Sequence, residues 1–82
     1  MNELEDLIKE VQWAQKNQQL ENLLEGLLTP AEIREFSQRL EIIKLLKKGI
    51  PQHEIAARLK VGVATVSRGA KEILLGRFET VS

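Results

Sequence analysis

A threonine, a serine and an arginine close together are the residues of this chain best placed to do chemistry. Thr65, Ser67 and Arg68 fall on the outer turns of a helix that we predict from Val63 onward. Hydroxyl and guanidinium groups near the start of a helix can contact base edges and phosphates in the major groove of DNA. We therefore predict a DNA-binding surface here; the alternative is a helical hairpin that packs on a partner protein.

Catalytic and metal chemistry have little support in the sequence. The chain has no cysteine and one histidine, and no carboxylate is spaced to complete a nucleophile triad with that histidine. It has no glycine-rich phosphate loop, and it lacks the thiol and imidazole ligands of a structural zinc site. We expect no enzyme activity, no metal site and no required cofactor.

The charged residues are unevenly distributed, although the net charge is zero. Residues 1–41 carry nine acidic and four basic side chains, whereas residues 42–82 carry three acidic and eight basic ones. This separation indicates that the basic half faces a polyanion. The alternative is that solvated helix faces are sorted in this way by chance. The lysines expected to attract the polyanion are Lys44, Lys47, Lys48, Lys60 and Lys71.

Apolar spacing and helix-end signals predict an all-α fold. Apolar residues recur every three to four positions over 3–16 and 20–28, which is typical of amphipathic helices. Thr29, Pro30 and Glu32 form a capping-box pattern that starts a third helix, and Gly49 ends it. No run of alternating β-branched residues predicts a strand. We expect a single domain over 1–82, divided into dimerisation helices (1–28), a core helix (29–49), a helix-turn-helix (51–75) and a tail (76–82).

Two short predicted helices after Gly49 match a helix-turn-helix. One runs from Gln52 to Leu59 and the other from Val63 to Leu74, with Gly62 in the three-residue turn between them. A glycine lets the second helix begin without steric cost. The residues that we expect to face inward are Ile55, Ala56, Leu59, Val66, Ala70, Ile73 and Leu74 in this segment, and Ile33, Phe36, Leu40, Ile43 and either Leu46 or Lys47 on the core helix.

The short chain predicts an oligomer. A domain of 82 residues buries only a little over about 60% of its unfolded surface, so its stability is marginal alone. The leucine-rich first 28 residues supply an apolar surface for a homodimer. No segment approaches the ~20 apolar residues of a membrane helix, and the acidic N-terminus is unlike a signal peptide. We expect a cytoplasmic homodimer without membrane contact.

From Leu28 to Lys71 the chain resembles the Trp repressor family. The motifs that carry the resemblance are Leu28-Thr29-Pro30, Gln38-Arg39-Leu40, the segment from Gly49 to Glu54 and, above all, the block from Gly62 to Gly69. The resemblance implies an intertwined dimer, a repressor function, and binding to double-stranded DNA at a two-fold symmetric operator. It also implies that His53 approaches the DNA. The expected DNA-facing residues are therefore His53, Gly62, Val63, Ala64, Thr65, Ser67, Arg68 and Lys71.

The resemblance further implies a ligand, because some members of the family bind L-tryptophan as corepressor. At the matching positions, Arg39 and Arg68 would sandwich the indole, and guanidinium planes do stack well on aromatic rings. Gly69 would leave room for the ring. Leu28 and Thr29 match the segment that the other subunit contributes.

Glu72 departs from the tryptophan-binding pattern of the family, which has a small residue close to the ligand carboxylate. An acid at this place would repel that carboxylate. One alternative is therefore a regulator that works without a ligand, in which Arg39 only pairs with Glu35 and Arg68 only binds a phosphate. A helical protein-interaction module is the other alternative.

Overall fold

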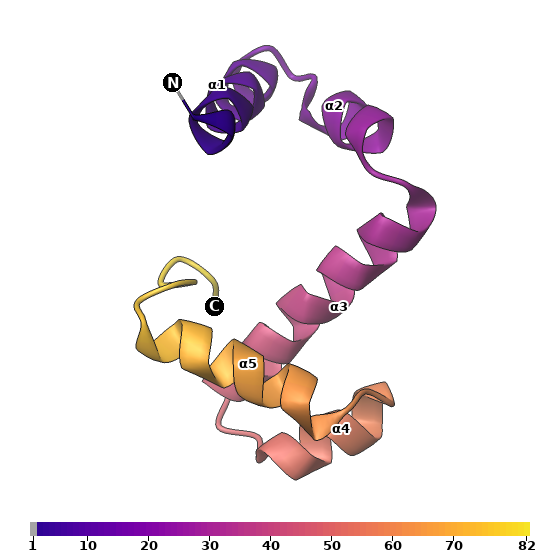
Figure 1. Ribbon diagram of the computed structural model, residues 1–82, viewed down its shortest axis with the longest axis vertical. Coiled ribbons are helices and arrows are strands. Elements are labelled where there is room, and N and C mark those ends of the chain that lie inside the picture. The colour runs from indigo at the N-terminus through magenta and orange to yellow at the C-terminus, as the bar shows by residue number, and fades with distance from the viewer. Residues whose placement is uncertain (1) are drawn as a thin grey trace. The chain divides into compact units, whose positions relative to one another are not determined.

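A computed structural model describes residues 2–82, and these residues form helices and no strands. The helices are α1 (Glu3–Lys16), α2 (Leu20–Leu27), α3 (Pro30–Lys47), α4 (Gln52–Leu59) and α5 (Val63–Leu74), labelled in Figure 1. The all-α prediction is confirmed. The chain divides into two compact units, of which the first ends at Ile33 and the second runs from Arg34 to Ser82.

The first unit contains α1 and α2, which pack against each other. The Asn2 side chain accepts a hydrogen bond from the Glu5 amide at 2.8 Å and so caps the start of α1. Ala14 is the one residue that is buried among the described residues of this unit. The large apolar side chains of α1 and α2 that stay exposed are Leu4, Leu7, Ile8, Trp13, Leu24 and Leu27. These exposed apolar side chains agree with the expected homodimer, which stays a prediction.

The capping box at the start of α3 forms as predicted. The Thr29 amide donates to a carboxylate oxygen of Glu32 at 2.9 Å, and the Glu32 amide donates to the Thr29 hydroxyl at 3.1 Å. Two amides that would otherwise lack a helical partner are thereby satisfied. At the other end, Gly49 adopts a φ of 83°, which the predicted glycine stop requires.

The core of the second unit lies where α4 and α5 meet the last turns of α3. Its buried residues are Ile42 and Leu45 from α3, Ile55 and Ala56 from α4, and Val66 from α5. The sequence analysis missed Ile42 and Leu45, because it followed one stripe along α3. Near its end the helix is covered on more than one side, so neighbouring positions are buried together.

Four expected core residues lie outside the core of this chain. Their exposed fractions are 36% for Ile33, 50% for Phe36, 41% for Leu40 and 87% for Leu74, so these predictions were wrong for the single chain. A helix advances by about 100° per residue, which places Leu74 roughly 80° away from Val66, whereas Ile73 lies within roughly 20° of it. Ile73 is half-buried for this reason. Phe36 lies before the turns of α3 that α4 and α5 cover.

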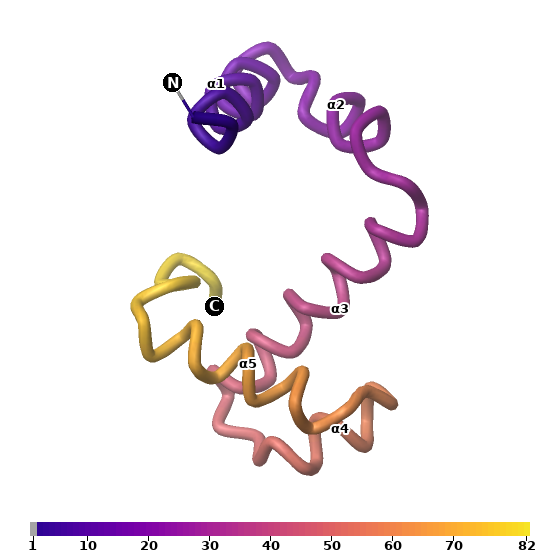
Figure 2. The backbone as a smooth tube through the Cα atoms, in the orientation of Figure 1, coloured from indigo at the N-terminus to yellow at the C-terminus, as the bar shows by residue number. Residues whose placement is uncertain are grey.

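The turn between α4 and α5, whose course can be followed in Figure 2, depends on Lys60 and not on the glycine. Lys60 adopts the left-handed conformation with φ 56°, and the Val61 amide returns to the Ala56 carbonyl at 3.1 Å. Gly62 has φ −71°, and a Cβ added to it would meet nothing within 4 Å. The predicted two-helix arrangement is present, but the steric role predicted for Gly62 is not.

Candidate nucleic-acid surface and adjoining pocket

The first turns of α5 present polar and cationic side chains to solvent. Val66 is fully buried in the core and fixes the rotation of the helix. Thr65 and Arg68 are consequently exposed, together with Val63 and Ala64. Lys71 is exposed one turn further on. The structure therefore places these predicted DNA-facing residues on an accessible surface of the second unit.

Ser67, another predicted DNA-facing residue, already has a partner within the chain. Its hydroxyl donates a hydrogen bond of 2.7 Å to the side-chain oxygen of Gln52, at the start of α4. This bond joins the two helices at their N-terminal turns and leaves the serine oxygen able to accept, but not to donate, a further bond. The sequence analysis did not single out Gln52. The sequence feature that could have pointed to Gln52 is a polar side chain at the first position of a helix that is predicted to cross another.

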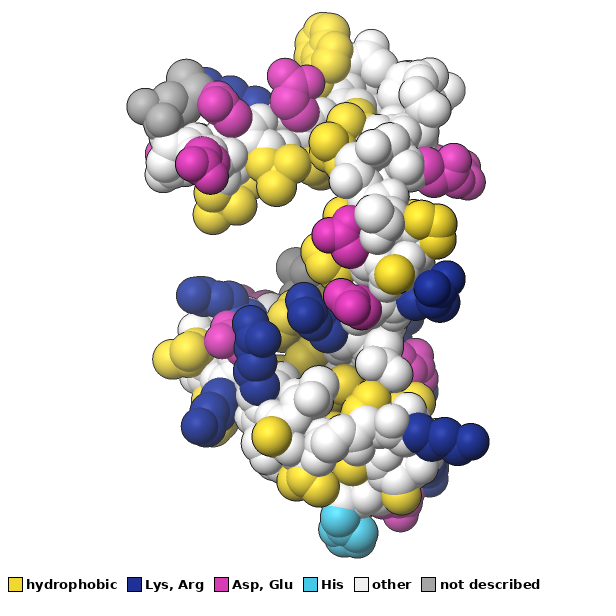
Figure 3. Space-filling model, turned by 45° about the vertical axis from the view of Figure 1, so that its right-hand side comes forward, with side chains coloured by type: hydrophobic (Ala, Val, Ile, Leu, Met, Phe, Trp, Pro, Cys, Tyr) yellow, Lys and Arg dark blue, Asp and Glu magenta, His cyan; other side chains and the backbone are white. Residues whose placement is uncertain are grey.

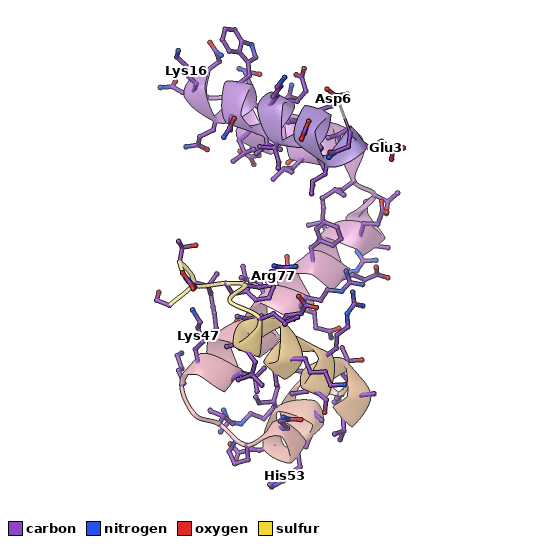
Figure 4. The ribbon with its side chains drawn as sticks, turned by 60° about the vertical axis from the view of Figure 1, so that its left-hand side comes forward. Glu3, Asp6, Lys16, Lys47, His53 and Arg77 are labelled. Carbon is purple, nitrogen blue, oxygen red and sulfur yellow. The ribbon has the colours of Figure 1, made fainter. Side chains whose placement is uncertain are left out.

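The N-terminus of α5 is open to an anion. Gly62 provides no side-chain cap, and the first turn of α5 contains no acidic residue. The positive end of a helix dipole then faces solvent, close in sequence to the exposed Lys60. Figure 3 shows several lysine and arginine side chains on the drawn face of the second unit. His53 is exposed on α4 and projects away from the rest of this unit (Figure 4).

A pocket of about 550 Å³ lies within the second unit, between α3, α5 and the segment after α5. Its lining residues are Arg39, Ile42, Ile43, Thr65, Arg68, Gly69, Glu72, Arg77 and Phe78. The structure thus brings together four of the predicted ligand residues, namely Arg39, Arg68, Gly69 and Glu72. Leu28 and Thr29, the other two, belong to the first unit.

Gly69 lies at a tight contact between α5 and α3. A Cβ at this position would lie 3.2 Å from Ile43 Cδ1 and 3.3 Å from Ile42 Cγ2. The missing side chain therefore lets the two helices approach closely beside the pocket. Its predicted role, room for a ligand ring, stays a prediction.

The pocket is cationic on balance, and one of its arginines lies over an aromatic ring that is not part of the pocket lining. Its lining residues include three arginines and one glutamate. The guanidinium carbon of Arg39 lies 5.7 Å from the centre of the Phe36 ring. The ion pairs of the described residues do not include one between Arg39 and Glu35. Arg39 is therefore oriented by a ring and not by an acid.

The segment after α5 contributes two pocket residues that the sequence analysis assigned only to a tail. Arg77 and Phe78 follow Gly76, whose φ is 88°, and Phe78 itself has φ 63°. The Lys47 ammonium donates to the backbone carbonyls of Phe78 and Val81, which holds the segment near the end of α3. Lys47 and Arg77 can be followed in Figure 4. The sequence feature that could have pointed to these two residues is Gly76, a helix-ending glycine directly before a cation and an aromatic residue.

The fold and this surface define a helix-turn-helix protein. The family model described as Trp repressor protein matches residues 2–78, and the chain belongs to that family. In the described part of the chain, no helix is long and apolar enough to cross a membrane. No group of three or more acidic or histidine side chains there could hold a metal ion.

Several curated proteins are similar to this chain, and each bears the name Trp operon repressor homolog. The one from Vibrio campbellii is 43% identical over 58 residues, which are 70% of this chain and 58% of that protein. The one from Vibrio vulnificus is 37% identical over 71 residues, or 85% of this chain and 67% of that protein. The one from Mannheimia succiniciproducens is 43% identical over 56 residues, or 67% and 55%. The chain thus spans little more than half the length of the first relatives, and no solved structure matches it.

Proposed function

We propose that this protein is a sequence-specific DNA-binding repressor of the Trp repressor type. The observation that supports this proposal best is the uncapped start of α5 with Thr65 and Arg68 exposed beside it. Small and cationic side chains at this end of a recognition helix suit a major groove, and free helix amides suit a phosphate. The relatives' names designate a repressor, which agrees with this assignment and gives no support to an enzyme.

A homodimer follows from the same proposal. The exposed apolar side chains of α1 and α2 need a covering surface, and a second copy of the chain supplies an identical one. Two recognition helices related by a two-fold axis would enter major-groove segments about one helical turn apart. The operator is then two-fold symmetric. Val63 and Ala64 would touch thymine methyl groups, while Thr65 and Arg68 bond bases or phosphates.

L-Tryptophan is the ligand that we assign to the pocket as corepressor. The pocket's volume is in the range of small-molecule sites, and two of its arginines, Arg39 and Arg68, can stack on a flat aromatic ring. Arg68 belongs both to the pocket lining and to the exposed surface of α5, so an occupied pocket would orient a DNA-facing side chain. Leu28 and Thr29 of the partner subunit would close the site, as the family resemblance implies.

The salt dependence of DNA binding tests the DNA-binding proposal. Fluorescence anisotropy of a labelled duplex should show binding at low salt that weakens steeply as salt rises, because each phosphate contact releases counterions. We expect a loss of about 10³-fold or more between 50 and 200 mM salt if each dimer makes six or more phosphate contacts. A protein-interaction module would show no binding at either salt concentration, and that result would reject the proposal.

A further inference from the structure

The pair formed by Glu72 and Arg77 is positioned by the way in which α5 ends. The Arg77 amide bonds to the Glu72 carbonyl at 3.0 Å, and the Gly76 amide bonds to the Ile73 carbonyl at 3.0 Å. With Gly76 in the left-handed region, these two bonds form a Schellman motif. The motif brings the backbone of Arg77 back beside Glu72, five residues earlier. The helix stop therefore brings the two residues close enough for their side chains to pair.

The side chains of this pair meet at the pocket. The Nε atom of Arg77 lies 3.5 Å from a carboxylate oxygen of Glu72, and both residues line the pocket. The bonds from Lys47 to the carbonyls of Phe78 and Val81 hold the next residues of the segment near α3. Arg77 is thus held at both sides of its position in the chain. Its guanidinium faces the one acid that the pocket contains.

We propose that Arg77 determines which ligands the pocket accepts, and that it acts through Glu72. By offsetting the Glu72 charge, Arg77 weakens the repulsion between Glu72 and a ligand carboxylate, so a ligand with its own carboxylate binds more tightly. The ligand class is then a flat aromatic compound with a carboxylate, of which an aromatic amino acid is one case. This inference rests on the proposed ligand pocket. Arg77 is accordingly a positioning residue for the Glu72 charge and not a direct contact of the ligand.

The charges of the ligand give a direct test by calorimetry on the full chain. Indole-3-propionate has a carboxylate and no ammonium, tryptamine has the ammonium alone, and L-tryptophan has both. In Arg77→Gln, the unpaired Glu72 charge should weaken the binding of indole-3-propionate about three- to tenfold. An effect of this size is expected for one charge in a partly solvated site. Glu72→Gln should strengthen the binding of indole-3-propionate by a similar factor. The affinity for tryptamine should change in the opposite direction in each variant.

The double variant separates an indirect role of Arg77 from a direct one. With Glu72→Gln and Arg77→Gln together, both charges are absent and the affinity for indole-3-propionate should return to within about twofold of wild type. Raising the salt concentration should shrink every difference, because both side chains are partly exposed. Arg58→Gln is the matched control: Arg58 pairs with Glu54 at similar exposure on α4, outside the pocket lining, and should leave all three affinities unchanged.

Two results would overturn the inference, and they differ in what they say of the proposed function. If the double variant binds indole-3-propionate as weakly as Arg77→Gln does, Arg77 contacts the ligand directly and the inference is wrong, while the pocket stands. If wild-type protein binds duplex DNA but none of the three ligands at millimolar concentration, the inference and the corepressor assignment both fail. The DNA-binding proposal would survive that second result.

Discussion

Arg68→Ala should abolish specific DNA binding and leave the fold intact. Arg68 is exposed on α5 and is the one arginine of that helix, so its guanidinium is the group best suited to a guanine edge. A bidentate contact of this kind is worth about 1–3 kcal/mol. A symmetric dimer carries it twice, so the expected loss is about 2–6 kcal/mol, which is about 30-fold to about 20,000-fold in affinity. Anisotropy with an operator duplex measures this loss.

The control for this variant is Arg34→Ala, which removes another exposed arginine far from α5 in the sequence. Circular dichroism should give the same helix content for both variants as for wild type, because neither side chain belongs to the core. If Arg68 also neutralises a phosphate in each subunit, the slope of log affinity against log salt should fall by about two in Arg68→Ala. Wild-type affinity in Arg68→Ala would reject the assignment of this surface.

A second large effect is expected from the core residue that orients α5. Val66→Ala removes two methyl-sized groups from a fully buried site and leaves a cavity, so it should lower the free energy of unfolding by about 2–3 kcal/mol. Val63→Ala is the same substitution three residues earlier on the same helix, where the side chain is 52% exposed. It should change the free energy of unfolding by less than about 0.5 kcal/mol.

Urea denaturation followed by circular dichroism gives both values for the valine pair. The pair also separates stability from recognition: Val63→Ala should weaken operator binding through loss of a thymine-methyl contact, while leaving the folded state as stable as before. Equal destabilisation by the two substitutions would contradict the described rotation of α5. It would mean that Val63 and Val66 are buried to a similar extent in solution.

The helices could be predicted from the sequence because their end signals are local. The Thr29–Glu32 capping box, the stop at Gly49 and the start after Gly62 act over a few residues, and the structure reproduces each boundary. The family could be recognised for a related reason, since the most specific of its motifs, from Gly62 to Gly69, is one continuous block. Local patterns also placed Val66 inside and Thr65 and Arg68 outside, because a helix has one period.

The parts that could not be predicted depend on how the elements meet. Ile42 and Leu45 are buried because α4 and α5 both cover the end of α3, which no single stripe on α3 reveals. The bond from Ser67 to Gln52 joins residues fifteen positions apart across a helix crossing. Arg77 became a pocket residue only through the Schellman motif that reverses the chain after α5.

Glu72 illustrates the same limit for the site. From the sequence it is an isolated acid that would repel a ligand carboxylate. In the structure it has a cationic neighbour, Arg77, at 3.5 Å, and two further arginines line the same pocket. The meaning of a charged residue in a binding site therefore depends on partners that the linear pattern does not identify.

The central claim is that the surface formed by the start of α5 binds duplex DNA, and nuclear magnetic resonance tests it most directly. Nitrogen-15-labelled protein would be titrated with a duplex of two-fold symmetric sequence, and the amide signals compared before and after. The account predicts that the largest shifts cluster at residues 62–68, with smaller ones near His53 at the start of α4. Shifts confined to α1 and α2, or no shifts at low salt, would contradict it.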